Sequence, residues 1–121
     1  MTSWLSAAAR LGASTLVIER GAQLGGTMTS AGVNAPGLFH INGARQIIAG
    51  IGWELVLKTL AENRETLPQF KPRKEHWLNQ IKLNESLYAC IAEEELAKAG
   101  GKILYYSYPV KIAEEAGGYK I

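Results

Sequence analysis

Helix-forming, β-prone and glycine-rich segments follow one another along the chain. Residues 7–11 are strong helix formers and stop at Gly12, a residue suited to the left-handed conformation that ends many helices. The next segment, residues 14–19, contains the β-prone run Thr15-Leu16-Val17-Ile18, the pattern of a strand buried on both faces of a parallel sheet. A helix, a tight turn and a buried strand predict part of a βαβ unit.

Residues 21–43 show neither the helical nor the strand period and are punctuated by glycine, so they predict a long loop. Loops of this length inside a compact domain are uncommon and are often functional. Small residues at four neighbouring positions would let the backbone approach a ligand closely: Thr27, Thr29, Ser30 and Ala31. We therefore expect a functional loop here.

Helical spacing resumes over residues 44–63, where two neighbouring apolar stripes are expected to enter the core. Their members are Ile47, Ile51 and Leu55, and Ile48, Val56 and Leu60. A second helix is predicted to begin after Asn84, a good N-cap, and to end at Gly100-Gly101. It would pair Glu94 with Lys98 in solvent and turn four residues inward, Leu87, Tyr88, Ile91 and Leu96.

The remaining residues, 102–121, alternate and are rich in tyrosine and β-branched residues. The pattern predicts strands at 103–107 and 110–112, and the turn signal Gly117-Gly118 predicts a β-hairpin at the end of the chain. With 121 residues, a hydrophobic fraction of 47% and a mean hydropathy of -0.03, the chain is expected to form one packed domain at most.

Charge and composition exclude several classes of function. The net charge of +2 is too small to indicate nucleic acid, and the basic cluster Lys71, Arg73 and Lys74 is interpreted as a solvated surface loop. Every apolar run is shorter than the roughly 20 residues of a membrane span, and no export signal stands at the start. The cytoplasm is the expected location.

The chain contains no aspartate, which excludes a catalytic Ser-His pair supported by Asp and an EF-hand calcium loop. His40 and His76 have no metal-ligand spacing, so we expect no metal. Cys90, the only cysteine, is interpreted as a small core residue within the second helix rather than a nucleophile.

Glu19 ends the predicted buried strand, where doubly wound folds bind ligands and where a carboxylate can accept hydrogen bonds from ribose hydroxyls. A carboxylate that ends a strand in solvent fits the position equally well. The surrounding stretch, AAARLGASTLVIERGAQLGGTMTSAG at residues 7–32, closely resembles the FAD-dependent oxidoreductases with a glutathione-reductase-type dinucleotide-binding domain. Three elements carry the resemblance in the family's order, namely Ala-Arg-x-Gly at 9–12, Glu-Arg at 19–20 and Leu-Gly-Gly at 24–26.

The resemblance implies FAD as the cofactor and assigns roles to residues of this chain. It implies Glu19 at the adenosine ribose, Arg20 and Gly26 near the adenosine and diphosphate, and Gly25 in the same glycine pair. It places Thr27, Met28 and Ser30 toward the pyrophosphate and flavin, and the backbone of Val110 against the adenine. No catalytic acid or base can be named, and the substrate would be a small molecule of the parent enzyme.

The sequence departs from the family in lacking GxGxxG, whose amides meet the pyrophosphate at a helix end. Counting back from Arg10 places its third glycine close to Met1, so the first strand and glycine loop would precede this chain. The expected fold is therefore α/β, a partial Rossmann-like FAD-binding domain over residues 1–121 that lacks its first strand. Within it lie a motif region (7–32), a helical segment (44–99) and strands (102–121).

Three functions stay open. In the first, the chain is a fragment of an FAD-dependent oxidoreductase, which flavin binding would test. We expect the isolated chain to be inactive. The second is a non-catalytic relic or interaction fragment that completes its sheet with another chain, since an uncovered sheet edge favours self-association. The third is an unrelated small α/β domain whose glycines only make turns.

Overall fold

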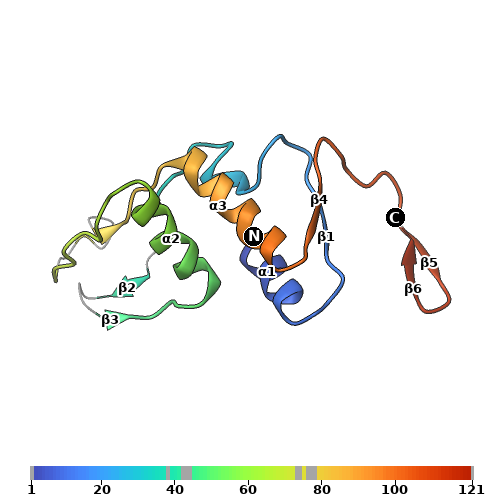
Figure 1. Ribbon diagram of the computed structural model, residues 1–121, viewed down its shortest axis with the longest axis horizontal. Coiled ribbons are helices and arrows are strands. Elements are labelled where there is room, and N and C mark those ends of the chain that lie inside the picture. The colour runs from blue at the N-terminus through green and yellow to red at the C-terminus, as the bar shows by residue number, and fades with distance from the viewer. Residues whose placement is uncertain (1, 38, 42–44, 73–74, 76–78, 121) are drawn as a thin grey trace.

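The computed structural model describes residues 2–37, 39–41, 45–72, 75 and 79–120. Over these residues helices and short strands are mixed, as an α/β chain requires (Figure 1). The α-helices are α1 (Thr2–Arg10), α2 (Ile51–Glu62) and α3 (Glu85–Lys98), and η1 (Gly26–Met28) is a 3-10 turn. The strands are β1 (Leu16–Ile18), β2 (His40–Ile41), β3 (Arg45–Gln46), β4 (Lys102–Leu104), β5 (Ala113–Glu115) and β6 (Gly118–Lys120).

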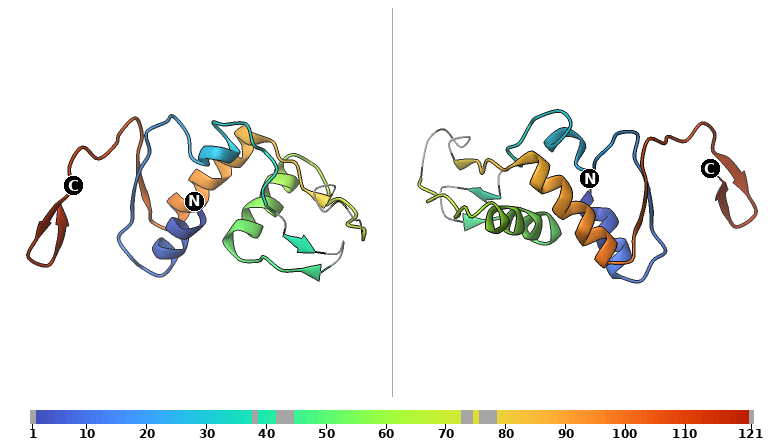
Figure 2. Two further views of the ribbon diagram at one scale, coloured as in Figure 1. Left: turned by 180° about the vertical axis from the view of Figure 1, so that it is seen from behind. Right: turned by 45° about the horizontal axis from the view of Figure 1, so that its top comes forward.

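Strand β1 pairs with β4 in parallel, with Val17 opposite Ile103. The chain between these strands contains α2 and α3, so the pair is closed by a long helical crossover. Helix α3 packs against both α1 and α2. Figure 2 shows α1 and α3 next to the strand pair, with α2 on the other side of α3. The parallel strand predicted at residues 14–19 is confirmed, although the observed strand is shorter. Its predicted burial on both faces is wrong, because Leu16 is 55% exposed on the face that the helices do not cover.

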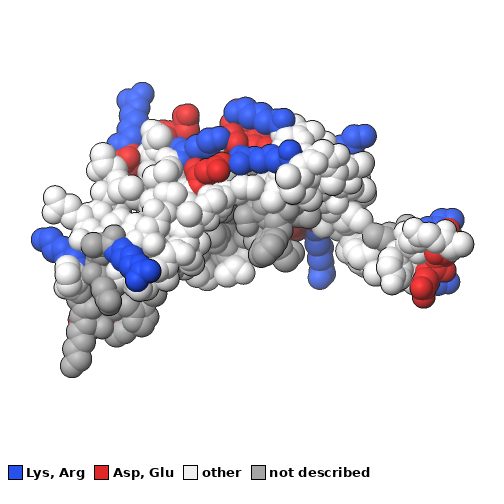
Figure 3. Space-filling model, turned by 90° about the horizontal axis from the view of Figure 1, so that it is seen from below, with Lys and Arg blue, Asp and Glu red and all other residues white. Residues whose placement is uncertain are grey.

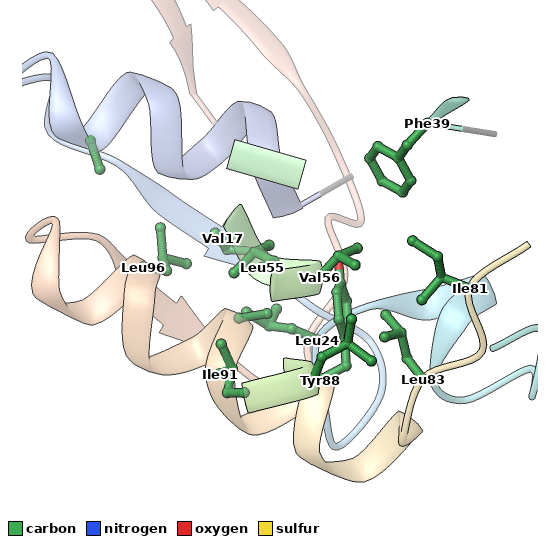
Figure 4. Packing of buried hydrophobic residues seen from close by; sticks show 13 residues of the cluster. Val17, Leu24, Phe39, Leu55, Val56, Ile81, Leu83, Tyr88, Ile91 and Leu96 are labelled. Carbon is green, nitrogen blue, oxygen red and sulfur yellow. The ribbon is translucent and has the colours of Figure 1, made fainter. Parts of the chain in front are cut away.

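The core lies between the helices and the inner face of β1. Leu55 and Val56 from α2 meet Tyr88 and Ile91 from α3, and Leu24 from the loop after β1 lies between them (Figure 4). The inward direction predicted for the second helix is confirmed, because Tyr88, Ile91 and Leu96 are buried and Leu87 is packed against the core.

Helix α3 has the boundaries that its sequence predicts. The Asn84 side chain accepts a hydrogen bond from the Leu87 backbone N–H at 3.1 Å, which satisfies one of the unpaired donors of the first turn. At the other end Gly100 has φ +83°, the left-handed conformation that follows many helices. The predicted outward pair of Lys98 with Glu94 is also present, at 2.8 Å.

Helix α2 begins later than the pattern at residues 44–63 predicts. Arg45 and Gln46 form strand β3 against β2, and the helix starts only after Gly50. Ile47 and Ile48 therefore precede the helix and are about half exposed, which contradicts their prediction as core residues. Ala44 lies outside the described residues. The remaining stripe residues are buried or partly buried as predicted: Ile51, Leu55, Val56 and Leu60.

The C-terminal segment was predicted only in part. The strand expected at 103–107 covers Lys102–Leu104, and Tyr106 bends the chain at φ +53°. The strand expected at Val110–Ile112 is wrong, because residues 110–112 are not in a strand and both Val110 and Ile112 are exposed. Alternation alone cannot make a strand where no neighbouring strand pairs with it. The terminal β-hairpin is confirmed as β5 and β6, and it projects away from the helices in Figure 1.

Two single-residue interpretations have different outcomes. Cys90 was expected in the core but is exposed on α3, because the helix turns Ala89 and Ile91 inward on either side of it. Lys71 is exposed, as expected for a surface loop, while Arg73, Lys74 and His76 lie outside the described residues.

Acidic and basic side chains lie next to each other along one border of the molecule, rather than in a patch of one sign (Figure 3). This arrangement accords with the ion pairs that join the helices, including Arg10 with Glu54 and Lys58 with Glu95.

Candidate functional site

A cavity of about 490 Å³ lies at the end of β1, between that strand, the glycine-rich turn and α3. Its size falls in the range of small-molecule sites. Five of the residues singled out from the sequence line it together: Glu19, Gly25, Gly26, Thr27 and Met28. The other lining residues are Leu16, Val17, Ile18, Leu24 and Tyr88. The cavity therefore has a mainly apolar wall with one carboxylate at the strand end.

Glu19 is held at this position by the backbone on both sides. Its N–H donates to the carbonyl of Leu104 at 2.9 Å, which continues the β1–β4 pairing by one residue. Its side-chain Oε1 accepts a hydrogen bond from the N–H of Gly21 at 2.7 Å, so the carboxylate also closes the turn after the strand. A fixed carboxylate at the end of a parallel strand is an acceptor suited to hydroxyl groups.

Glycine is required at positions 25 and 26 for two different structural reasons. Gly25 has φ +110°, and a Cβ there would lie 2.4 Å from Cγ2 of Thr29. Gly26 has φ +55° but no atom within 4 Å of a Cβ position, so its requirement comes from the backbone conformation. Together they let the chain make the tight 3-10 turn Gly26–Met28 along the cavity.

Thr29 locks this turn onto the core. It is buried, and its Oγ1 donates to the carbonyl of Leu24 at 2.8 Å. Leu24 is itself buried among the helices, so the turn is fixed relative to α2 and α3. The rigidity of the cavity wall thus depends on a residue that does not line it.

Tyr88 was interpreted from the sequence only as a core residue, yet it also lines the cavity. Helical periodicity places it on the inner face of α3 but cannot tell that the loop after β1 crosses the same face. The sequence carries no local signal for this role, because the contact joins segments more than sixty residues apart.

Three sequence-predicted residues, Arg20, Ser30 and Val110, are not among the cavity's lining residues. Ser30 is exposed one turn further along, where Gln23 Nε2 donates to its Oγ at 3.4 Å. Val110 is 87% exposed in the segment between β4 and β5. The structure therefore gathers Glu19 and residues 25–28 at the cavity and leaves Arg20, Ser30 and Val110 outside its lining.

Arg20 follows Glu19 on the exposed side of the turn and meets a residue that the sequence did not single out. Its guanidinium carbon lies 6.0 Å from the ring centroid of Tyr108, within the range of a cation–π contact. Two backbone hydrogen bonds bring the segments together, from Ser107 N to Glu19 O at 3.1 Å and from Tyr106 N to Gly21 O at 3.3 Å.

A second, larger cavity of about 660 Å³ lies beyond the end of α2 and contains none of these residues. It is lined by Leu60, Arg64, Glu65, Thr66, Pro68, Gln80, Ile81 and Lys82. Its charged residues are of both signs.

Within the described ranges, no group of three or more His, Cys, Asp or Glu side chains could hold a metal ion. The same part of the chain contains no helix that is long and apolar enough to cross a membrane.

The sequence model of the FAD dependent oxidoreductase family matches residues 6–121. The chain belongs to this family. The match covers both the cavity residues and the C-terminal hairpin, so the resemblance seen at residues 7–32 extends through the rest of the chain. Searches of the curated proteins and of the solved structures gave no match.

Family membership suggests FAD as the cofactor, and the cavity can be compared with that molecule. Glu19 offers an acceptor for the ribose hydroxyls, and the glycine turn leaves open backbone beside it. The residues present thus fit the adenosine part of a dinucleotide. The sequence holds no GxGxxG, so the amide cradle that usually meets the diphosphate is not among them.

Proposed function

We propose that this chain forms the adenosine side of the FAD site of an FAD-dependent oxidoreductase. One observation carries the proposal: Glu19 and the turn Gly25–Met28 line one cavity at the carboxyl end of a parallel strand. Ligands of doubly wound α/β proteins bind at such ends, outside the sheet. The proposal treats residues 1–121 as part of an FAD-binding domain of the Rossmann type.

In this proposal Glu19 accepts hydrogen bonds from the ribose hydroxyls, and Arg20 lies beside the adenosine. Gly25 and Gly26 keep the backbone free of side chains where the diphosphate passes, and Thr27, Met28 and Ser30 lie toward the pyrophosphate and the flavin. Val110 would contact the adenine through its backbone. Support for this set is the shared cavity for five of the eight residues, together with the family match.

The bound FAD would supply the redox chemistry, accepting and donating electrons or a hydride, while the protein supplies position and electrostatics. A small-molecule substrate would be held by parts of the enzyme other than the cavity described. Because the sequence lacks GxGxxG, we infer that the chain is a fragment of its parent enzyme and that its own grip on the diphosphate is weak.

The test is a titration of FAD into the purified protein, followed by the change in flavin fluorescence. We expect saturable binding that Glu19→Ala weakens about tenfold, because a charge-assisted hydrogen bond contributes about 1.5 kcal/mol. Glu62→Ala, at the end of α2 and exposed, is the matched control and should bind as the unchanged chain does. A folded protein that shows no saturable FAD binding would contradict the proposal.

A second candidate is a non-catalytic interaction fragment that completes its sheet with another copy of the chain. It is favoured by the two-stranded β1–β4 sheet, whose outer edges pair with no other described strand. It is also favoured by the bare face of this pair, where Leu16 is 55% exposed and Leu104 is 50% exposed. The register places both on the same face, since Leu16 is opposite Lys102 and Ile18 is opposite Leu104. Parallel strands are normally covered on both faces.

This candidate predicts a dimer or larger assembly in solution. Light scattering coupled to size-exclusion chromatography should show it, and the double variant Leu16→Lys/Leu104→Lys should shift the protein to the monomer. Leu57→Lys and Leu67→Lys, at exposed leucines elsewhere, are the matched controls and should leave the mass unchanged. A monomeric unchanged chain rules this candidate out.

A further inference from the structure

Tyr108 is a large aromatic side chain that lies beside Arg20, the residue after Glu19, without being buried. It is 66% exposed, and the Arg20 guanidinium lies over its ring at 6.0 Å. Exposed tyrosines usually need no explanation, but this one is brought to Arg20 by a specific backbone arrangement.

That arrangement begins at Tyr106, whose φ of +53° is unusual for a bulky residue. The bend redirects the chain after β4, so that residues 106 and 107 bond the turn after β1 through Gly21 O and Glu19 O. The Ser107 hydroxyl adds a further bond to the carbonyl of Tyr105 at 2.9 Å. A backbone conformation that costs about 1–3 kcal/mol persists only where surrounding contacts determine it, and such positions cluster at ligand sites.

The separation between the Arg20 guanidinium and the Tyr108 ring is close to the one that would admit a planar ring between them. Stacked carbon atoms are optimal at about 3.5 Å, so a base between the two groups needs a separation of about 7 Å. The observed 6.0 Å has to widen by only about 1 Å, and both side chains are exposed and able to turn. Stacking on an aromatic face and a cation above it both favour a purine.

We propose that Tyr108 and Arg20 form a stacking platform for the adenine base of the dinucleotide, next to Glu19. The inference rests on the proposed FAD site and adds to it the residue that recognises the base. Base and ribose are joined by one bond, so a ribose held by Glu19 brings its base to the neighbouring residues. Arg20 adjoins Glu19 in the chain, and Tyr108 faces Arg20.

The experiment measures binding of AMP, FMN and FAD by calorimetry to the full chain and to variants at Tyr108. Tyr108→Ala should weaken AMP binding about tenfold, whereas Tyr108→Phe should keep it within about twofold, because base stacking contributes about 1–3 kcal/mol and needs only the ring. Tyr119→Ala, in the hairpin and 74% exposed, is the matched control and should bind AMP as the unchanged chain does. FMN lacks the adenine, so its binding should be the same in all variants.

The outcomes separate this inference from the proposed function. Equal AMP and FAD affinity in the unchanged chain and Tyr108→Ala would overturn the platform while leaving the FAD site intact. Tyr108-dependent AMP binding without FAD binding would support the platform and contradict the FAD site. An unchanged chain that binds neither AMP nor FAD overturns both.

Discussion

Lys58 on α2 places its Nζ 2.6 Å from Oε2 of Glu95 on α3, and that carboxylate is only 7% exposed. Arg10 at the end of α1 reaches the same oxygen at 3.3 Å, and Lys98 approaches the other oxygen at 3.4 Å. One buried carboxylate therefore joins the α-helices α1, α2 and α3. The position of the cavity wall depends on these helices, which makes Glu95 a structural centre for the candidate site.

Glu95→Gln should destabilise the fold by about 1–3 kcal/mol, because it removes the charge around which three cations gather while keeping the side-chain volume. The partly exposed cations retain contact with water, which keeps the loss below that of a fully buried pair. Urea unfolding followed by circular dichroism measures this loss of unfolding free energy. Glu94→Gln is the control, since that residue is 60% exposed and its pair with Lys98 should contribute less than about 0.5 kcal/mol.

Stability should also fall in acid through the same residue. The hydrogen bond from Lys58 is the main cause that lowers the pKa of Glu95 below its ordinary 4.5. The ionised Glu95 therefore contributes its full share of the unfolding free energy well above pH 4.5. This contribution is lost as the pH falls below 4.5 and through the lower pKa that Glu95 has in the folded state. Unfolding free energies measured from about pH 6 to about pH 3 should drop less steeply in Glu95→Gln than in the unchanged chain. Parallel slopes would contradict this assignment.

Gly25→Ala should disrupt the glycine turn, because the new Cβ would lie 2.4 Å from Thr29 Cγ2 and the backbone is at φ +110°. We expect a loss of stability of about 2 kcal/mol or more, together with weaker FAD binding. Thermal unfolding and the flavin titration measure the two effects. A variant as stable as the unchanged chain would show that the turn differs from the one described.

Gly52→Ala should have the opposite effect on stability from Gly25→Ala. Gly52 lies in the first turn of α2, and a Cβ there would meet no atom within 4 Å. Alanine loses less conformational entropy than glycine in a helix, so the substitution should stabilise the protein by about 0.5–1 kcal/mol. The thermal midpoint should rise without a change in flavin binding.

Tyr105 connects the end of β4 to α3, since its hydroxyl donates to Glu93 Oε2 at 2.6 Å. Burial, followed by this bond and the nearby carboxylate charge, raises the pKa of the Tyr105 phenol above its ordinary value. Tyr105→Phe should cost about 1 kcal/mol, and Tyr106→Phe, at a 77% exposed side chain, should cost almost nothing. In an alkaline titration followed by phenolate absorbance, Tyr105→Phe should remove a late-ionising component.

The local features of the fold follow from the sequence because their causes are local. Asn84 as a helix cap, Gly100 after the last turn and the inward side of α3 all depend on neighbours within a few residues. Ile47 and Ile48 show the limit of this reasoning. Their spacing fits a helix, but the chain there enters the β2–β3 pair, and pairing with another segment overrides a periodic pattern.

The sequence by itself determined the family motif, the order of helix, strand and glycine turn, and a candidate site of eight residues: Glu19, Arg20, Gly25, Gly26, Thr27, Met28, Ser30 and Val110. Tertiary structure decided that five of these residues line a common cavity, that Tyr88 lines it as well and that Tyr108 meets Arg20. The physical reason is that these contacts join segments far apart in the chain. Their formation depends on the parallel pairing of β1 with β4 and on helix packing, neither of which leaves a signal in short stretches of sequence.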